Sequence, residues 1–206
     1  MSHHLWVGFC ASVPLVPFLI YFAYIQIWAM KVTRQAEKQS LLIAAADLAR
    51  RVLKIADVHG ITVEKGDNHS ESGFDLERKK IFLSPKVYDE TNFLSVGTVL
   101  EKAGHAILGF HNEKTLAVWK TTMIACTTGF WIVAFLLPAG LIVASIPTIV
   151  AGYVLLFTAF GLRLFCASIE TQMHENVLKQ LDKIDGVGQT NIAEIRQVLK
   201  ALAVLW

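Results

Sequence analysis

The strongest constraint on the fold of this chain is its longest stretch without charge. Residues 121–162 contain no Asp, Glu, Lys or Arg. A helix needs about 20 apolar residues to cross a bilayer, so this stretch is long enough for two crossings. Pro138-Ala139-Gly140 interrupts it near the middle, and Pro and Gly favour a turn there. The sequence therefore predicts a transmembrane helical hairpin with arms at about 121–137 and 141–162.

A second charge-free stretch lies near the N-terminus. Residues 5–30 lack charged side chains and are long enough for one crossing. A cleaved signal peptide is the weaker interpretation, because no Lys or Arg precedes the stretch and its apolar run is too long. We therefore expect a membrane anchor at residues 1–30. The hydrophobic content of 54% and the mean hydropathy of +0.48 also indicate an integral membrane protein.

The basic residues predict how the chain is oriented. Lys31, Arg34 and Lys38 follow the first charge-free stretch, whereas no Lys or Arg precedes it. Positive charge accumulates on the cytoplasmic side of a membrane, or on the matrix side in an organelle. We expect the N-terminus outside and the soluble portion on the cytoplasmic or matrix side. The membrane would be a bacterial plasma membrane or a mitochondrial inner membrane.

Between the anchor and the hairpin the pattern changes to that of a small α+β portion. Residues 39–59 have apolar residues at helical spacing, with Leu42 on the apolar side. Residues 61–64 and 80–83 are rich in apolar and β-branched side chains, which predicts two short strands. The polar, Gly-containing residues 65–75 between them predict a loop.

After the hairpin the chain is predicted to be helical again. A helix is expected from Arg163 to Ile184, where glycines at 186 and 188 end it. Asn191, with Glu194 three residues later, resembles a capping box and predicts the start of a last helix. That helix carries an apolar stripe, which usually packs against a neighbour.

The sequence feature closest to known chemistry lies in residues 95–113, an apolar helix pattern. Glu101 and His105 are four residues apart and so project from one face. In H-E-x-x-H two His at this spacing bind zinc, and the intervening Glu is the general base. Here the first His position is Glu101 and the base position is Lys102, while Gly104 and His105 keep the pattern. A charged lysine cannot take a proton from metal-bound water.

The segments around this helix extend the match. With Asp47–Leu53, Arg78–Tyr88, the apolar pair of helices and Ala167–Thr171 in the same order, most of residues 1–180 resembles the YugP-type membrane-anchored neutral zinc metallopeptidases. The resemblance implies a mostly α integral membrane protein. It would have three transmembrane helices, a small α+β soluble portion at 31–120 with a zincin-like motif helix, and C-terminal helices at 163–206.

The resemblance also implies roles for individual residues. The family's second His ligand corresponds to His105, and its downstream carboxylate ligand corresponds to Glu170. The first His ligand corresponds to Glu101, which could bind a metal through oxygen, and the catalytic Glu corresponds to Lys102. His174 lies four residues after Glu170 and is a candidate fourth ligand, with a solvated helix residue as the plainer reading.

These residues leave three hypotheses. The one we favour is a catalytically inactive, protease-derived membrane protein that serves as a structural or accessory subunit of a larger membrane complex. The alternatives are an active zinc metallopeptidase with the altered ligands Glu101, His105, Glu170 and His174, and a non-catalytic metal-binding or regulatory protein.

The favoured hypothesis sets the expected cofactors and partners. We expect no cofactor, with zinc as the alternative. The expected partners are the lipid bilayer and other membrane-protein subunits. A net charge of +2 argues against nucleic acid. If no metal binds, Lys102 is expected to pair with Glu170 or Glu101.

Overall fold

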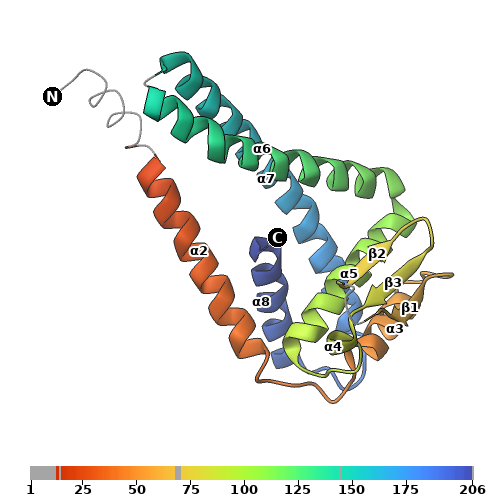
Figure 1. The fold of residues 1–206 in the computed structure, drawn as a ribbon. Coiled ribbons are helices and arrows are strands. Elements are labelled where there is room, and N and C mark those ends of the chain that lie inside the picture. Colours follow the sequence, from red (N-terminus) through yellow and green to blue (C-terminus); the bar gives the residue numbers. More distant parts are fainter. Residues whose placement is uncertain (1–12, 14, 68–70, 144, 206) are drawn as a thin grey trace. The chain divides into compact units, whose positions relative to one another are not determined.

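The computed structural model describes residues 13, 15–67, 71–143 and 145–205 (Figure 1). They form a mostly helical chain with one small sheet, which confirms the predicted fold class at this level. The chain divides into two compact units. The first takes residues up to Ile25 together with Ala117–Ile169, and the second takes Gln26–Leu116 together with Glu170–Trp206. The predicted division of the chain into membrane and soluble segments stays a prediction.

In the first unit, two long helices lie side by side. They are α6 (Glu113–Val143) and the first part of α7 (Ile146–Leu181), and both are long and apolar enough to cross a membrane. Only 28% of the apolar window of each helix is buried, so neither resembles the core helix of a soluble protein. Large side chains such as Trp131, Phe135 and Phe157 are exposed.

Small residues make one part of the contact between α6 and α7, and a cluster around Val133, Leu137 and Leu156 makes another. A Cβ placed on Gly129 would lie 3.3 Å from the Cβ of Ala159. One turn earlier on α6, the Cys126 thiol donates a hydrogen bond to the Ala159 carbonyl at 3.2 Å. Small residues let two helix backbones approach closely, which is how membrane helices commonly pack.

The predicted break of the hairpin at Pro138 is wrong, because α6 continues through Pro138 to Val143. An internal proline removes one helical hydrogen bond, and long apolar helices often tolerate this loss. α6 ends at Val143, and α7 begins at Ile146. The Ser145 carbonyl accepts from Ile149 N at 3.0 Å, and the Ser145 and Thr148 hydroxyls are 2.9 Å apart. Pro147 then occupies the first turn of α7, where a proline costs no hydrogen bond.

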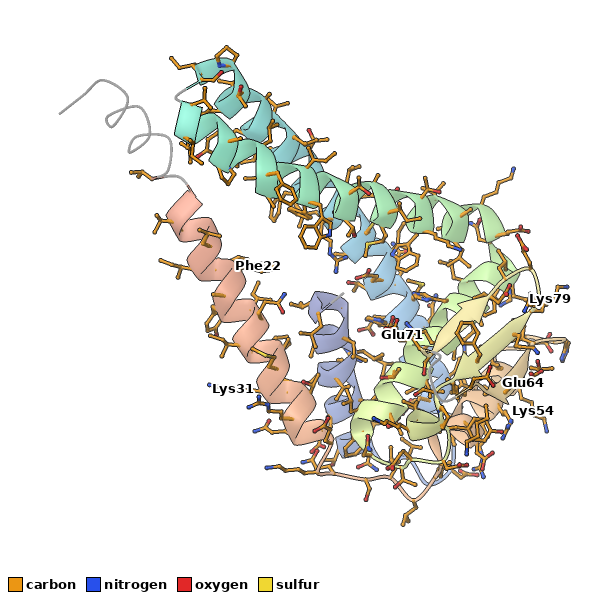
Figure 2. All side chains as sticks on the ribbon, in the orientation of Figure 1. Phe22, Lys31, Lys54, Glu64, Glu71 and Lys79 are labelled. Atoms are coloured by element: carbon orange, nitrogen blue, oxygen red, sulfur yellow. The ribbon has the colours of Figure 1, made fainter. Side chains whose placement is uncertain are left out.

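The N-terminal helix α2 (Leu15–Ala36) extends beyond the predicted anchor into the basic segment. Residues 1–12 and 14 of that anchor lie outside the described part of the chain. Figure 2 shows Phe22 and Lys31 projecting from α2, and Phe22 is 54% exposed. Within the described residues only α6 and α7 are long and apolar enough to cross a membrane, so the third transmembrane helix stays a prediction.

The second unit is built around α5 (Phe93–His111), which carries the motif residues (Figure 1). It packs against α3 (Ala45–Ile55), α4 (Pro85–Tyr88), α8 (Gln189–Leu205) and the sheet. The Asn92 side chain caps α5 by accepting from Ser95 N at 2.8 Å. At Gly97 an added Cβ would lie 2.5 Å from Val198 Cγ1, so α8 approaches closely there.

The last helix, α8, begins at Gln189, two residues before the start predicted from Asn191. The Gly188 carbonyl accepts from Ile192 N at 3.1 Å, so the helical turn already includes residues before the supposed cap. The apolar stripe expected on this helix is confirmed. Its buried members are Ile192, Ile195, Val198, Leu199 and Leu202.

The sheet has three strands in the order β1-β3-β2. β1 (Thr62–Lys65) pairs in parallel with β3 (Lys80–Leu83), and both confirm the strands predicted at 61–64 and 80–83. β2 (Gly73–Asp75) pairs antiparallel with β3. The prediction of a loop over residues 65–75 is therefore wrong at its end. β2 is three residues long, too short for an alternating pattern.

The helix predicted over residues 39–59 is also shorter in the structure, because α3 begins only at Ala45. The preceding residues pair with residues 90–93 through three backbone hydrogen bonds. Leu41 N donates to the Thr91 carbonyl at 2.8 Å, Ala45 N to Glu90 at 2.9 Å, and Phe93 N to Gln39 at 3.0 Å. Leu42, placed by the pattern on the apolar side, is 99% exposed.

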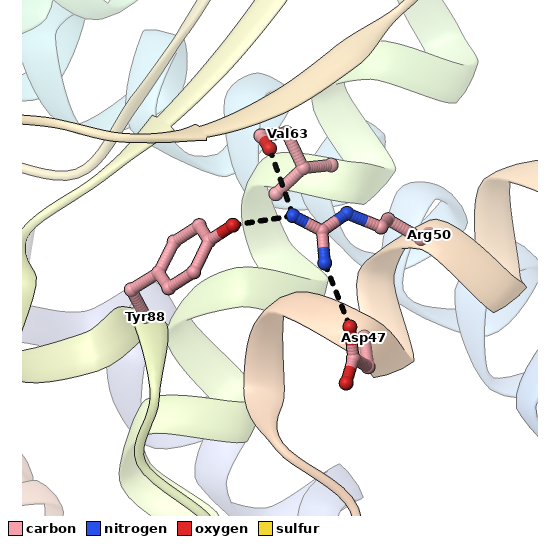
Figure 3. A network of polar contacts seen from close by, with 4 residues as sticks. All are labelled: Asp47, Arg50, Val63 and Tyr88. Carbon is pink, nitrogen blue, oxygen red and sulfur yellow. Dashed lines mark hydrogen bonds and ion pairs between the residues drawn. The ribbon is translucent and has the colours of Figure 1, made fainter.

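One polar network ties α3 to β1 and α4 (Figure 3). The Arg50 guanidinium donates to Asp47 at 2.7 Å, to the Val63 carbonyl at 3.1 Å and to the Tyr88 hydroxyl. It also lies 5.5 Å from the centre of the Tyr88 ring, within range of a cation–π contact. The network joins two of the segments that carried the sequence resemblance.

Candidate functional site

The motif residues of α5 lie on its inward side. The side chains of Glu101 and Lys102 are 12% and 13% exposed, and Ala103 and Gly104 are buried. α5 takes this position because most of its residues are apolar and pack into the core of the second unit. Two ionisable side chains are thus carried into a largely apolar environment, where their charges need compensation.

Gly104 marks the place where α7 approaches α5. A Cβ on Gly104 would lie 3.2 Å from Val177 Cγ2 and 3.6 Å from Met173 Cβ. The glycine therefore allows the part of α7 after residue 169 to pack closely against the motif helix. Glu170 and His174 belong to this same part of α7. The candidate ligands therefore lie on two helices, α5 and α7, that pack against each other at Gly104.

Glu170 and His174 are both buried, with 6% and 8% exposure. The reading of His174 as a solvated helix residue is therefore wrong. Among the described residues, only Ser95 is a further buried polar or charged residue. A buried polar side chain needs partners, so this part of α7 is not an ordinary packing surface.

Lys102 forms an ion pair with its neighbour. Its ammonium Nζ lies 2.8 Å from Glu101 Oε1, which confirms the expectation that Lys102 pairs with Glu101 or Glu170. The second oxygen of Glu101, Oε2, is buried and has no hydrogen-bond partner among the described residues. Glu101 is therefore compensated at one oxygen only.

His105 is held in its neutral form. Burial, and then the positive charges of Lys102 and of His174, lower the pKa of His105 to about 3. His174 lies beyond the charge-free part of α7, and burial lowers its pKa to about 4, although the Glu175 carboxylate opposes the shift. Both imidazoles are uncharged at neutral pH and have a lone pair for a hydrogen bond or a metal.

A zinc site needs at least three protein ligands in a tetrahedral arrangement. Within the part of the chain that the structure describes, no three His, Cys, Asp or Glu side chains are grouped closely enough to hold a metal ion. In addition, one oxygen of Glu101 is already bound to an ammonium group. The arrangement of Glu101, His105, Glu170 and His174 does not fit zinc.

Two features of the second unit were not predicted from the sequence. The close approach at Gly104 is one, although the glycine itself was part of the motif. The other is Glu194 on α8, whose Oε2 is buried without a hydrogen-bond partner in the described chain. The sequence had assigned Glu194 only to a helix start, and no local pattern marks it as buried.

Comparison with known proteins gives one result. The model of a family described as "Putative neutral zinc metallopeptidase" matches residues 11–206. No curated protein and no solved structure matches the chain. The matched range includes the motif helix and the two buried polar residues of α7, Glu170 and His174.

Proposed function

Because this chain belongs to the neutral zinc metallopeptidase family, we propose that it is an inactive member that serves as a structural or accessory subunit of a larger membrane complex. The observation that carries the proposal is the Lys102–Glu101 ion pair at 2.8 Å. It occupies the two motif positions where the family's chemistry needs a metal ligand and a general base.

The chemical argument concerns the general base. Peptide hydrolysis at a metal needs a group that takes a proton from the bound water. The Lys102 ammonium already holds its proton and shares it with Glu101. An ammonium group has donors only and no lone pair to accept a proton, so this side chain does not supply the base that the reaction needs.

The argument for a membrane complex rests on exposed apolar surface. α6 and α7 expose large apolar side chains along most of their charge-free length. Such exposure is unfavourable in water, but it is favourable against lipid or the helices of a partner. We further propose that α2 is the third transmembrane helix, with the N-terminus outside. The second unit then lies on the cytoplasmic or matrix side, beside the basic residues that follow the anchor.

The test of inactivity compares the natural chain with the variant Glu101→His/Lys102→Glu, which restores the motif. Both are purified in detergent with zinc and incubated with an unfolded protein substrate. We expect no chelator-sensitive cleavage by the natural chain. Such cleavage would show that the active alternative with altered ligands is correct.

The test of the accessory role is native purification from the source membrane under mild detergent. We expect the chain to migrate with a stoichiometric set of other membrane subunits. Migration as a single chain in lipid would contradict the proposal.

A further inference from the structure

We infer that the Lys102 ammonium takes over the electrostatic role of the family's metal ion, so that the contact between α5 and α7 is stable without zinc. The inference rests on the proposed loss of catalysis and deepens it. It says what replaced the metal when the reaction was lost.

The first step concerns the carboxylate. Glu101 is 12% exposed and lies in a mostly apolar environment. A buried carboxylate without a counter-charge is unstable unless it binds a proton or a cation. In a zinc site the metal supplies that charge. Here the ammonium of Lys102, 13% exposed, lies 2.8 Å from Oε1 and supplies it from the chain itself.

The second step concerns position. Glu101 is the first residue of the H-E-x-x-H spacing, and the Lys102 ammonium lies 2.8 Å from its Oε1. The ammonium group therefore occupies one oxygen of the side chain that would be the first metal ligand. An ammonium at this position repels a divalent cation. The Lys102–Glu101 ion pair and a bound zinc ion therefore exclude each other.

The third step concerns packing. Gly104 lets the α7 backbone approach to within 3.7 Å of an added Cβ, at the carbonyl of Met173. A metal bound between two helices holds them together through its ligands. In this chain the close packing of Gly104 with Met173 and Val177 holds the two helices together. The ion pair compensates the negative charge of Glu101, which would otherwise destabilise the buried contact.

The experiment uses the full chain in detergent micelles, with metal content measured by mass spectrometry and unfolding followed by heating. Lys102→Met removes the ammonium and keeps most of the side-chain volume. Lys80→Met is the matched control. Lys80 forms an ion pair with Glu64 at 2.6 Å, but the two side chains are 36% and 48% exposed, so its loss should matter little.

We expect sub-stoichiometric zinc in the natural chain and an unfolding midpoint unchanged by a chelator or by added zinc. Lys102→Met should lower the midpoint by several degrees, Lys80→Met much less, and Glu101→Gln/Lys102→Met should recover part of the loss. Stoichiometric zinc, a chelator-sensitive midpoint, or equal effects of the two lysine variants would overturn the inference. Bound zinc without peptidase activity would overturn only the inference about Lys102. Peptidase activity would overturn the proposed function.

Discussion

Acidification below pH 6.5 should destabilise this protein through His105. The pKa of His105 is lowered from its ordinary value of 6.5 to about 3 in the folded chain, first by burial and then by Lys102 and His174. Between these two values the unfolded chain binds a proton that the folded chain does not. Stability is therefore complete above pH 6.5 and falls as the pH decreases toward 3.

The size of the effect follows from the same shift. Each pH unit below the unfolded pKa costs about 1.4 kcal/mol as long as the folded imidazole stays neutral. At pH 5, roughly 1.5 units below that value, His105 alone should therefore cost about 2 kcal/mol. His174, whose pKa is lowered to about 4 mainly by burial, acts in the same direction.

The assay is urea unfolding of the full chain in detergent micelles at pH 7.5 and pH 5, followed by tryptophan fluorescence. The variant His105→Asn cannot titrate, so its loss of stability between the two pH values should be smaller by about 2 kcal/mol. His59→Asn is the matched control, because the His59 side chain is 77% exposed. It should keep the full pH dependence of the natural chain.

Two results would refute this reasoning. One is a free energy of unfolding that is equal at pH 7.5 and pH 5 in the natural chain. The other is an identical loss in His105→Asn, which would place the titration on different groups.

Other variants test the fold and the membrane arrangement. Gly97→Ala places a Cβ 2.5 Å from Val198 Cγ1, and we expect a loss of about 1–3 kcal/mol from overpacking, reduced by about 1 kcal/mol of helix propensity. Val198→Ala in the same chain should recover part of it, and a stabilised Gly97→Ala would contradict the close approach. Tyr88→Phe removes one acceptor of a half-exposed guanidinium and should cost less than about 1 kcal/mol. Cysteines introduced at Ser2 and Asn191 should be labelled from opposite sides of the membrane, and equal labelling would exclude three crossings.

The sequence was sufficient to predict those elements whose own residues determine their structure. The helix α5 has apolar spacing throughout and a capping side chain at Asn92, and the predicted helix was found there. The helix prediction was wrong for residues 39–44, because the backbone of this segment forms hydrogen bonds with residues 90–93, far away in the chain. The apolar spacing that includes Leu42 continues the helix pattern of α3, so periodicity could not reveal the end of the helix. The turn predicted at Pro138 was wrong because proline usually ends a helix, whereas a long apolar helix such as α6 accommodates it.

The sequence selected candidate site residues but did not reveal how they are arranged. Spacing and resemblance selected Glu101, Lys102, His105, Glu170 and His174, and the structure brings their helices together. The burial of His174 could not be read from its own helix, because Arg163, Glu170 and Glu175 make that stretch look solvated. The choice of Glu101 as the partner of Lys102 also depends on rotamers, since adjacent helix positions diverge by about 100°.

The backbone pairing of residues 39–41 with residues 91–93 has a consequence for how this chain can vary. It brings together the two ends of the segment that contains α3, the sheet and α4, so the segment leaves and rejoins the rest of the second unit at one place. A segment with adjacent ends can be lengthened, shortened or exchanged as a block while the chain on either side keeps its course. The sheet side of this protein can therefore vary in length without displacing α5, provided that the face of α3 that packs on α5 in their common core is kept.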